Sequence, residues 1–163
     1  MVSVGFVGLG NVGGKLAGSL LRNGIDLTVR DLDRDAAQPF LDGGASWGES
    51  PKAIAEACDV IITCLPSPAA SAAVMEAEDG ILAGLRPDSI WAEMSTTDEA
   101  EVKRLGAQVA AKDAAAVDCP VSGGCHRAAT GNIAILVGCD RPVFERMLPV
   151  LTLLGRRVLH TGP

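Results

Sequence analysis

The stretch Val2-Ser3-Val4-Gly5-Phe6-Val7-Gly8-Leu9-Gly10-Asn11-Val12-Gly13 decides the fold. Its first half is apolar and rich in β-branched residues, which predicts a buried strand over Val2–Val7. Its second half is a Gly-x-Gly-x-x-Gly turn, and the following segment Val12–Asn23 repeats apolar residues at helical spacing. A strand, a glycine turn and a helix in this order are typical of a dinucleotide-binding unit.

Further along the chain, short β-branched runs alternate with Ala- and Leu-rich segments of helical period. We expect strands at Val2–Val7, Asp26–Arg30, Asp59–Leu65, Ser89–Glu93, Ala115–Cys119, Ile133–Val137 and Arg156–His160. We expect helices at Val12–Asn23, Asp33–Leu41, Pro51–Ala57, Ala69–Ala77, Asp98–Lys112 and Arg141–Leu154. This alternation predicts an α/β fold of the Rossmann type, with a doubly wound, mostly parallel sheet flanked by helices. Residues 1–163 are expected to form one dinucleotide-binding domain.

The composition narrows the classes of function. The chain has 14 Lys and Arg residues against 20 Asp and Glu residues, which gives a formal charge of −6. An acidic chain with few aromatic rings is unsuited to DNA or RNA, so nucleic-acid binding is not expected. No apolar run approaches the roughly 18–20 residues of a membrane span, so no membrane association is expected. The five cysteines, an odd number mostly near strand-like runs, predict reduced thiols and a cytoplasmic location.

The glycine turn Gly8–Gly13 has the chemistry of a pyrophosphate site. Glycines let the backbone approach a phosphate, and the helix N-terminus offers unpaired N–H groups and positive potential. Asp31 comes at the end of the second expected strand, 18 residues beyond Gly13, where a carboxylate can accept both hydroxyls of an adenosine ribose. Because this carboxylate would repel a 2′-phosphate, it favours NAD over NADP. Arg30 and Arg34 could pair with such a phosphate if they turned toward the ribose, so NADP stays open.

Three other segments follow expected strands and reach the carboxyl edge of the sheet, where ligands bind. Leu65-Pro66 could form an apolar lip against the adenosine or ribose, or simply end a strand with a proline. Ser95-Thr96 follows a later strand, and Thr96 with Glu99 also fits a helix capping box that needs no ligand. Ser122-Gly123-Gly124 could form an anion nest for a substrate carboxylate, although a glycine-rich turn has the same composition.

The remaining reactive residue types form no strong catalytic or metal motif. Cys125 and His126 are adjacent, and adjacent residues seldom form a catalytic pair. The spacing of Cys119 and Cys125 does not match a zinc site, so we expect no metal. His160 ends an expected strand, which indicates a structural role, and the acidic residues of segment 76–79 are expected to be a solvated helix end.

Four motifs occur in order along the chain: Gly5-Phe6-Val7-Gly8-Leu9-Gly10-Asn11-Val12-Gly13, Leu65-Pro66, Ser95-Thr96 and Asp118-Cys119-Pro120-Val121-Ser122-Gly123-Gly124. Together they resemble the N-terminal domain of the β-hydroxyacid dehydrogenases, the 3-hydroxyisobutyrate dehydrogenase family. The resemblance covers essentially the whole chain. It implies NAD-dependent hydride transfer between a small β-hydroxy acid and a nicotinamide cofactor, with NADP possible. It also implies a homo-oligomer when the family's C-terminal all-helical domain is present.

The resemblance implies roles for particular residues. Cofactor-binding roles fall on Gly8, Leu9, Gly10, Asn11, Val12, Gly13, Asp31, Leu65, Pro66 and Thr96, and substrate-binding roles on Ser95, Ser122, Gly123 and Gly124. In this family Leu65-Pro66 would lie near the adenosine half of the cofactor and Ser95-Thr96 beside the nicotinamide. Arg30 stands where the family often has an aromatic residue, which leaves the cofactor preference open.

The general base of the family is a lysine on a helix that follows this domain, with an asparagine a turn later that helps to hold the substrate. The chain stops at Gly162-Pro163, where that segment would begin. Its lysines, Lys15, Lys52, Lys103 and Lys112, all lie on expected helices away from the ligand edge. We therefore expect no catalytic residue in this chain and no turnover by the chain alone. A non-catalytic dinucleotide-binding module and an S-adenosylmethionine-dependent methyltransferase are the alternatives.

Overall fold

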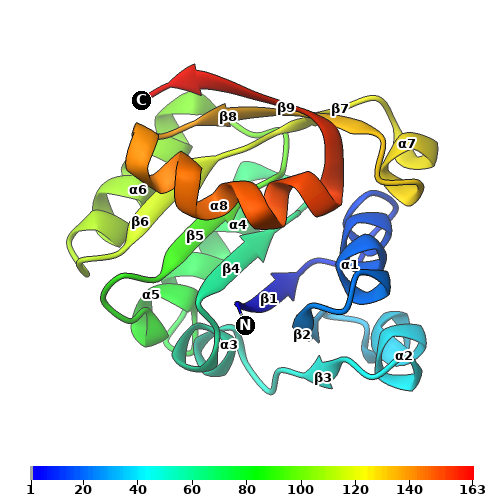
Figure 1. Ribbon diagram of the computed structural model, residues 1–163. Coiled ribbons are helices and arrows are strands. Elements are labelled where there is room, and N and C mark those ends of the chain that lie inside the picture. Colours follow the sequence, from blue (N-terminus) through cyan, green and yellow to red (C-terminus); the bar gives the residue numbers. More distant parts are fainter. Residues whose placement is uncertain (1) are drawn as a thin grey trace.

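The computed structural model describes residues 2–163 and shows one sheet covered by helices on both faces (Figure 1). The strands are β1 Ser3–Val7, β2 Asp26–Arg30, β3 Ser46–Trp47, β4 Val60–Thr63, β5 Ile90–Glu93, β6 Ala115–Asp118, β7 Val121–Ser122, β8 Ile133–Gly138 and β9 Gly155–Gly162. The helices are α1 Gly13–Arg22, α2 Arg34–Asp42, α3 Pro51–Ala57, α4 Pro68–Glu76, α5 Ile81–Gly84, α6 Glu99–Ala110, α7 Cys125–Ala129 and α8 Arg141–Leu154. The expected α/β fold of the Rossmann type is confirmed.

The strand order places a switch point, where ligands bind in folds of this type, in the middle of the sheet. The order is β3-β2-β1-β4-β5-β6-β8-β7, and β9 also pairs with β8. The strands from β3 to β6 pair in parallel, whereas β8 runs antiparallel to β6 and β7. From β1, the chain adds β2 and β3 on one side and then β4 to β6 on the other, so the strand order reverses between β1 and β4. In open α/β sheets, ligands bind beyond the carboxyl ends of the strands at such a switch point.

Two apolar cores lie on the two faces of the sheet. One face of β1, through Val4 and Phe6, belongs to the core that includes residues of α1, α2 and α8. The other face, through Val7, belongs to the core that includes residues of α3 to α6. All four residues of β4 are buried, as expected for a parallel strand covered on both sides. This double burial makes the central strands a rigid support for the loops at their carboxyl ends.

Short elements account for the differences from the sequence prediction. The strands β3 and β7 have two residues each, α5 has four and α7 has five, so none contains a full hydrophobic period. The alternative interpretation of Thr96 and Glu99 as a helix capping box is wrong. Asp98 is the N-cap of α6 instead, and its carboxylate accepts the N–H of Glu101 at 3.1 Å. The helix begins at Glu99, so Thr96 lies too far upstream to cap it.

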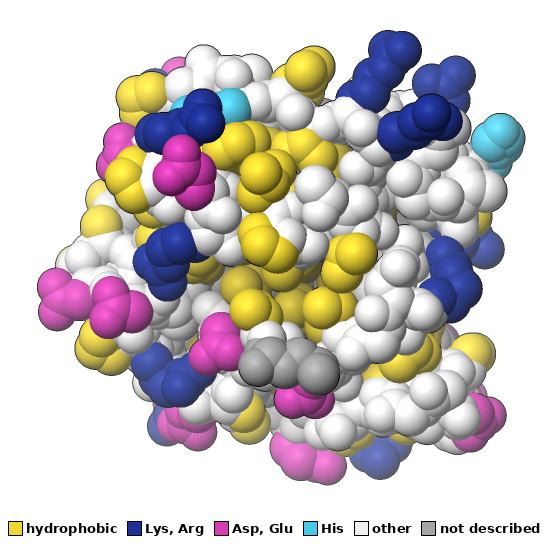
Figure 2. Space-filling view, viewed as in Figure 1, with side chains coloured by type: hydrophobic (Ala, Val, Ile, Leu, Met, Phe, Trp, Pro, Cys, Tyr) yellow, Lys and Arg dark blue, Asp and Glu magenta, His cyan; other side chains and the backbone are white. Residues whose placement is uncertain are grey.

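The surface carries apolar as well as charged regions. Figure 2 shows hydrophobic side chains gathered across the middle of the face on which α8 lies, with charged side chains toward the rim. Large exposed apolar side chains include Leu136 of β8 and Leu159 of β9, which face each other in the sheet register. Within residues 2–163, no helix is both long and apolar enough to cross a membrane.

Candidate functional site

A cleft of about 750 Å³ opens at the carboxyl edge of the sheet, over the switch point between β1 and β4. Most of the candidate residues line it: Gly8, Gly10, Asn11, Val12, Gly13, Asp31, Leu65, Pro66, Ser95, Thr96 and Gly124. Leu9, Ser122 and Gly123 do not line this cleft. The volume lies within the range of roughly 300–1,000 Å³ that is usual for small-molecule pockets. Residues from the ends of four parallel strands therefore face one cavity.

The glycine turn packs closely against its neighbours at two positions and is open at a third. A Cβ on Gly8, whose φ is +100°, would lie 2.3 Å from the carbonyl oxygen of Cys64. A Cβ on Gly13 would lie 2.1 Å from the carbonyl oxygen of Gly8. A Cβ on Gly10 would meet no atom within 4 Å, and Gly10 lines the cleft. The turn thus leaves an open cradle for a ligand group at Gly10.

The beginning of α1 offers free hydrogen-bond donors to the cleft. Val12 is the N-cap residue and provides no side-chain cap, and the first turn has no acidic residue. No acceptor among residues 2–163 pairs with the N–H groups of Gly10 through Gly13. Free amides at a helix N-terminus suit a negatively charged phosphate. The open cradle and the free amides together fit the pyrophosphate of a dinucleotide.

Asp31 connects the end of β2 to the glycine turn. Its Oδ2 accepts the N–H of Leu9 at 2.6 Å, and its Oδ1 accepts the N–H of Asp33 at 3.0 Å. A carboxylate has about four acceptor positions, so two remain for the hydroxyls of a ribose. Leu9 is buried, and its N–H is already used by Asp31. Leu9 therefore holds the turn in shape while its neighbours face the cleft.

Arg30 and Arg34, near Asp31, contact β3 or the loop that follows it. Nη1 of Arg30 donates to the carbonyl oxygens of Gly48 at 2.9 Å and Glu49 at 2.6 Å. The guanidinium groups of Arg30 and Arg34 lie 5.4 and 4.9 Å from the centre of the Trp47 ring. Arg30 itself lines the cleft, and turning its Nη1 toward a 2′-phosphate would break both hydrogen bonds. The sequence did not predict this anchoring, because Trp47 lies on a two-residue strand.

Ser95, which follows the end of β5, makes its side-chain hydrogen bonds within the protein. Its hydroxyl oxygen accepts the N–H of Leu65 at 2.7 Å, and its O–H donates to Glu93 at 2.5 Å. Burial raises the pKa of the Glu93 carboxyl above its usual range, and hydrogen bonds from Ser95 and Ser71 act in the opposite direction. Thr96, in contrast, is exposed and lines the cleft. The sequence gives no sign of a role for Glu93, because its partner Ser71 lies 22 residues away in the chain.

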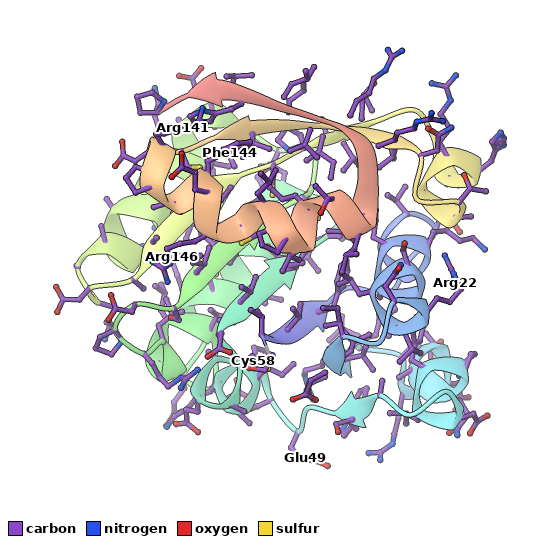
Figure 3. All side chains as sticks on the ribbon, viewed as in Figure 1. Arg22, Glu49, Cys58, Arg141, Phe144 and Arg146 are labelled. Atoms are coloured by element: carbon purple, nitrogen blue, oxygen red, sulfur yellow. The ribbon has the colours of Figure 1, made fainter. Side chains whose placement is uncertain are left out.

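The segment Ser122-Gly123-Gly124 is exposed at the far end of the same edge. Gly123 has a φ of +135° and Gly124 a φ of +80°, so the backbone itself favours glycine at both positions. The short helix α7 begins directly afterwards, and Arg22 of α1, labelled in Figure 3, donates to the carbonyl oxygen of Ala129 at 2.8 Å. A turn and an anion nest share this geometry, so the substrate role remains a prediction.

Besides Asp31, the titratable side chains that line the cleft are Arg30, Cys64 and Asp79. None of the lysines and histidines in the described chain lines the cleft. The ring of His160 stacks on Phe144, labelled in Figure 3, at 4.5 Å between centroids, and its Nε2 lies 2.7 Å from the carbonyl oxygen of Cys139. Burial, together with the nearby Glu93, raises the pKa of Cys64 to about 11, so this thiol is protonated at neutral pH. Residues 2–163 contain no group of three His, Cys, Asp or Glu side chains placed to hold a metal ion.

The sheet order, the glycine turn and the acid after β2 define a dinucleotide-binding domain. Over residues 3–162, the chain matches the family described as the NAD binding domain of 6-phosphogluconate dehydrogenase, and it belongs to that family. The mitochondrial 3-hydroxyisobutyrate dehydrogenase of Rattus norvegicus is 36% identical over 159 residues, which are 98% of this chain and 48% of the rat protein. The NAD-dependent L-serine dehydrogenase of Pseudomonas aeruginosa is 32% identical over 163 residues, 100% of this chain and 55% of that protein.

A solved structure of the 3-hydroxyisobutyrate dehydrogenase of Mycobacterium tuberculosis with L-serine superposes with a TM-score of 0.91 at 28% identity. The match covers 99% of this chain and 55% of that chain. The resemblance to the 3-hydroxyisobutyrate dehydrogenases, inferred from four motifs, is confirmed. The chain spans about half the length of the curated relatives it matches.

Proposed function

We propose that the protein is an NAD-dependent dehydrogenase of the 3-hydroxyisobutyrate dehydrogenase type, which transfers hydride between a small β-hydroxy acid and a nicotinamide cofactor. One observation carries the proposal: a single cleft runs from the glycine turn and Asp31 to the ends of β4 and β5. A dinucleotide is long enough to need both regions. Its nicotinamide, when bound, supplies the hydride acceptor, and the protein supplies binding and orientation.

The cofactor is assigned to residues along this cleft. The free amides from Gly10 to Gly13 would hold the pyrophosphate, and Asp31 would accept the hydroxyls of the adenosine ribose. The further assigned residues are Gly8, Leu65, Pro66 and Thr96, and Leu9 contributes by holding the turn in shape. NAD is the preferred form, because Asp31 would repel a 2′-phosphate and Arg30 is held by two carbonyl oxygens.

The substrate is assigned to Ser95 and to Ser122, Gly123 and Gly124. The names of the rat and Pseudomonas relatives contain 3-hydroxyisobutyrate and L-serine, and both molecules carry a hydroxyl group β to a carboxylate. No acceptor among residues 2–163 pairs with the N–H groups of Gly123 and Gly124. Those amides and the Ser122 hydroxyl suit a carboxylate, so a β-hydroxy acid is the proposed substrate class.

The proton acceptor for the substrate hydroxyl is proposed to lie outside residues 1–163. No lysine or histidine of the described chain lines the cleft, and the curated relatives are about twice as long. Residues 1–163 would then be one nucleotide-binding domain that works with the all-helical C-terminal domain of the family. The assembly of two or more copies through that domain remains part of this proposal.

A cytoplasmic location is proposed from the cysteines. All five are free thiols, as expected in a reducing compartment. The rat relative is named as mitochondrial, and the mitochondrial matrix would be the alternative compartment. Fractionation of the native cells with an antibody against the chain distinguishes the two.

The activity is tested by incubating the protein with NAD and a panel of small β-hydroxy acids while the NADH absorbance is followed. A protein that contains the C-terminal domain should show a sustained rise, and residues 1–163 alone should not, because a general base typically contributes about 10²–10⁴-fold. No turnover by the longer protein would favour a non-catalytic module. Sustained turnover by residues 1–163 that is lost on His126→Ala would show that the base is misplaced.

A further inference from the structure

Glu93 is a fully buried carboxyl group that the proposed reaction does not use. It ends β5 with no exposed surface. Its Oε1 accepts the N–H and the O–H of Ser95 at 2.9 and 2.5 Å, and its Oε2 accepts the O–H of Ser71 at 2.8 Å. No Lys, Arg or His among residues 2–163 forms an ion pair with it. The donors of Ser95 and Ser71, together with the Thr63 hydroxyl, therefore compensate the burial of this group.

These hydrogen bonds join three elements around the cleft. Ser71 lies on α4, and Ser95 lies in the loop between β5 and α6. The oxygen of Ser95 in turn accepts the N–H of Leu65, in the loop between β4 and α4. Because the O–H of Ser95 donates a hydrogen bond to Glu93, the lone pairs of the Ser95 oxygen are directed to the N–H of Leu65. Glu93 thus fixes the loops that carry Leu65 and Ser95, both of which line the cleft.

The strand order shows which end of a dinucleotide these loops would meet. Asp31, at the end of β2, would mark the adenosine ribose on one side of the switch point. The strands β4 and β5 lie on the other side. A dinucleotide that crosses the switch point therefore places its nicotinamide half over the loops that Glu93 connects. Leu65 would then lie nearer to that half than to the adenosine half, which the family resemblance implied.

Folding alone gives no reason for a carboxyl group at this position. Its neighbours in the sequence, Trp91 and Ala92 in the same strand and Met94 directly after it, are buried apolar side chains. A buried polar group that could be replaced by an apolar one is seldom a net gain in stability. We propose that Glu93 is a positioning residue for the nicotinamide end of the cleft, which it shapes through Ser95 and Leu65. This inference rests on the proposed function as an NAD-dependent enzyme.

The test compares two ligands that differ at the nicotinamide. NADH and ADP-ribose share the adenosine, pyrophosphate and second ribose, and only NADH has the ring. In Glu93→Gln, an amide NH₂ replaces one acceptor, so the Kd for NADH should rise about tenfold and that for ADP-ribose less than about twofold. Ser71→Ala removes a single donor and should raise the ratio of the two Kd values by a smaller factor in the same direction.

Ser89→Ala is the matched control. Its hydroxyl is also buried, but it precedes β5 at the opposite end of the strand and donates to the carbonyl oxygen of Arg86 at 2.6 Å. This variant should leave the ratio of the two Kd values unchanged. An equal loss for both ligands in Glu93→Gln, or no loss for either, would overturn the proposal, since a general loss of structure affects both. If Glu93→Gln does not fold, the ratio of the two Kd values in Ser71→Ala decides whether the proposal holds.

A second readout needs no cofactor. Hydrogen exchange of the backbone amides, followed by NMR, should be at least about tenfold faster at Leu65 in Glu93→Gln, while the Leu9 amide, bonded to Asp31, keeps its rate. An unchanged rate at Leu65 overturns the positioning role. Wild-type protein that bound neither NADH nor ADP-ribose would overturn the proposed function. The exchange at Leu65 would then still decide whether Glu93 holds the two loops together.

Discussion

The two glycine turns at the carboxyl edge, Gly8–Gly13 and Ser122–Gly124, share positive φ angles but differ in construction. The first is buried against the end of β4, is tied by Asp31 and opens a ten-residue helix. The second is exposed and opens a helix of five residues. The cofactor turn is thus shaped by contacts within this chain, whereas the proposed substrate turn has few. Packing of the surrounding chain, more than the glycines themselves, distinguishes the two turns.

The largest expected effect comes from the same substitution in both turns. Gly8 and Gly124 have φ values of +100° and +80°, so an alanine at either position is strained to a similar degree. At Gly8 the new Cβ would also meet the Cys64 carbonyl at 2.3 Å, while at Gly124 it would meet nothing within 4 Å. Gly8→Ala should lower the free energy of unfolding by about 3–5 kcal/mol and abolish NADH binding, and Gly124→Ala should cost about 1 kcal/mol. Denaturant unfolding measures both, and equal losses would remove the distinction.

The second prediction concerns the exposed turn. In the catalytically active protein, Ser122→Ala should lower kcat/KM about 10- to 100-fold, because a hydrogen bond to a charged group contributes about 1.5–3 kcal/mol. The affinity for NADH should hardly change, since Ser122 does not line the cleft. If Ser122–Gly124 is only a turn, the melting temperature will fall slightly while kcat/KM stays the same.

A smaller effect is expected on the preference of the protein for NADH over NADPH. Asp31→Asn keeps an acceptor for the Leu9 N–H but removes the negative charge, so the preference for NADH over NADPH should fall about tenfold. Arg30→Ala is the control, and because Arg30 is bonded to Gly48 and Glu49, NADPH affinity should change by less than about twofold. Parallel titrations at one ionic strength give both ratios. A selective loss of NADPH binding in Arg30→Ala would mean that Arg30 contacts the 2′-phosphate.

The smallest effect is expected at a surface ion pair outside the cleft. Glu76 was expected to be merely solvated, but Arg104 holds it with two hydrogen bonds at 2.6 and 2.8 Å, and Gln108 adds a third. Arg104 first, and then Gln108, lowers the pKa of Glu76 from 4.5 to about 2. A carboxyl group with a lowered pKa stabilises the fold above its usual pKa, and this contribution is lost as the pH falls toward 2.

The matching measurement is the melting temperature of the wild-type protein and of Glu76→Gln between pH 7 and pH 2. The difference between them should be small at pH 7, because the pair is exposed, and should vanish at the acid end. NADH binding at pH 7 should be the same in both proteins. A difference that does not depend on pH would show that the side chain stabilises the fold by packing.

Most of the fold was predictable from the sequence, because long elements carry their own periodicity. The helices α3 and α8 and the strand β2 have the predicted bounds, and β1 begins one residue later than predicted. The elements β3, β7, α5 and α7 were missed because two to five residues hold too little of a period. The helix start at Glu99 depended on which nearby polar residue became the N-cap.

The site was predictable where its residues are adjacent in the sequence. The glycine turn is one motif, and Asp31 follows it at a characteristic spacing. The link from Leu65 through Ser95 and Glu93 to Ser71 was not predictable. It exists only because β4 and β5 pair in parallel and bring together residues that lie far apart in the chain.

The central claim is that residues 1–163 bind a nicotinamide dinucleotide in the cleft between the glycine turn and β5. Fluorescence titration of this chain with NADH tests it most directly, with NADPH and S-adenosylmethionine as competitors. We predict saturable binding of one NADH per chain, weaker binding of NADPH, and no displacement of NADH by S-adenosylmethionine. Absence of saturable NADH binding, or displacement of NADH by S-adenosylmethionine at comparable concentrations, would contradict the claim.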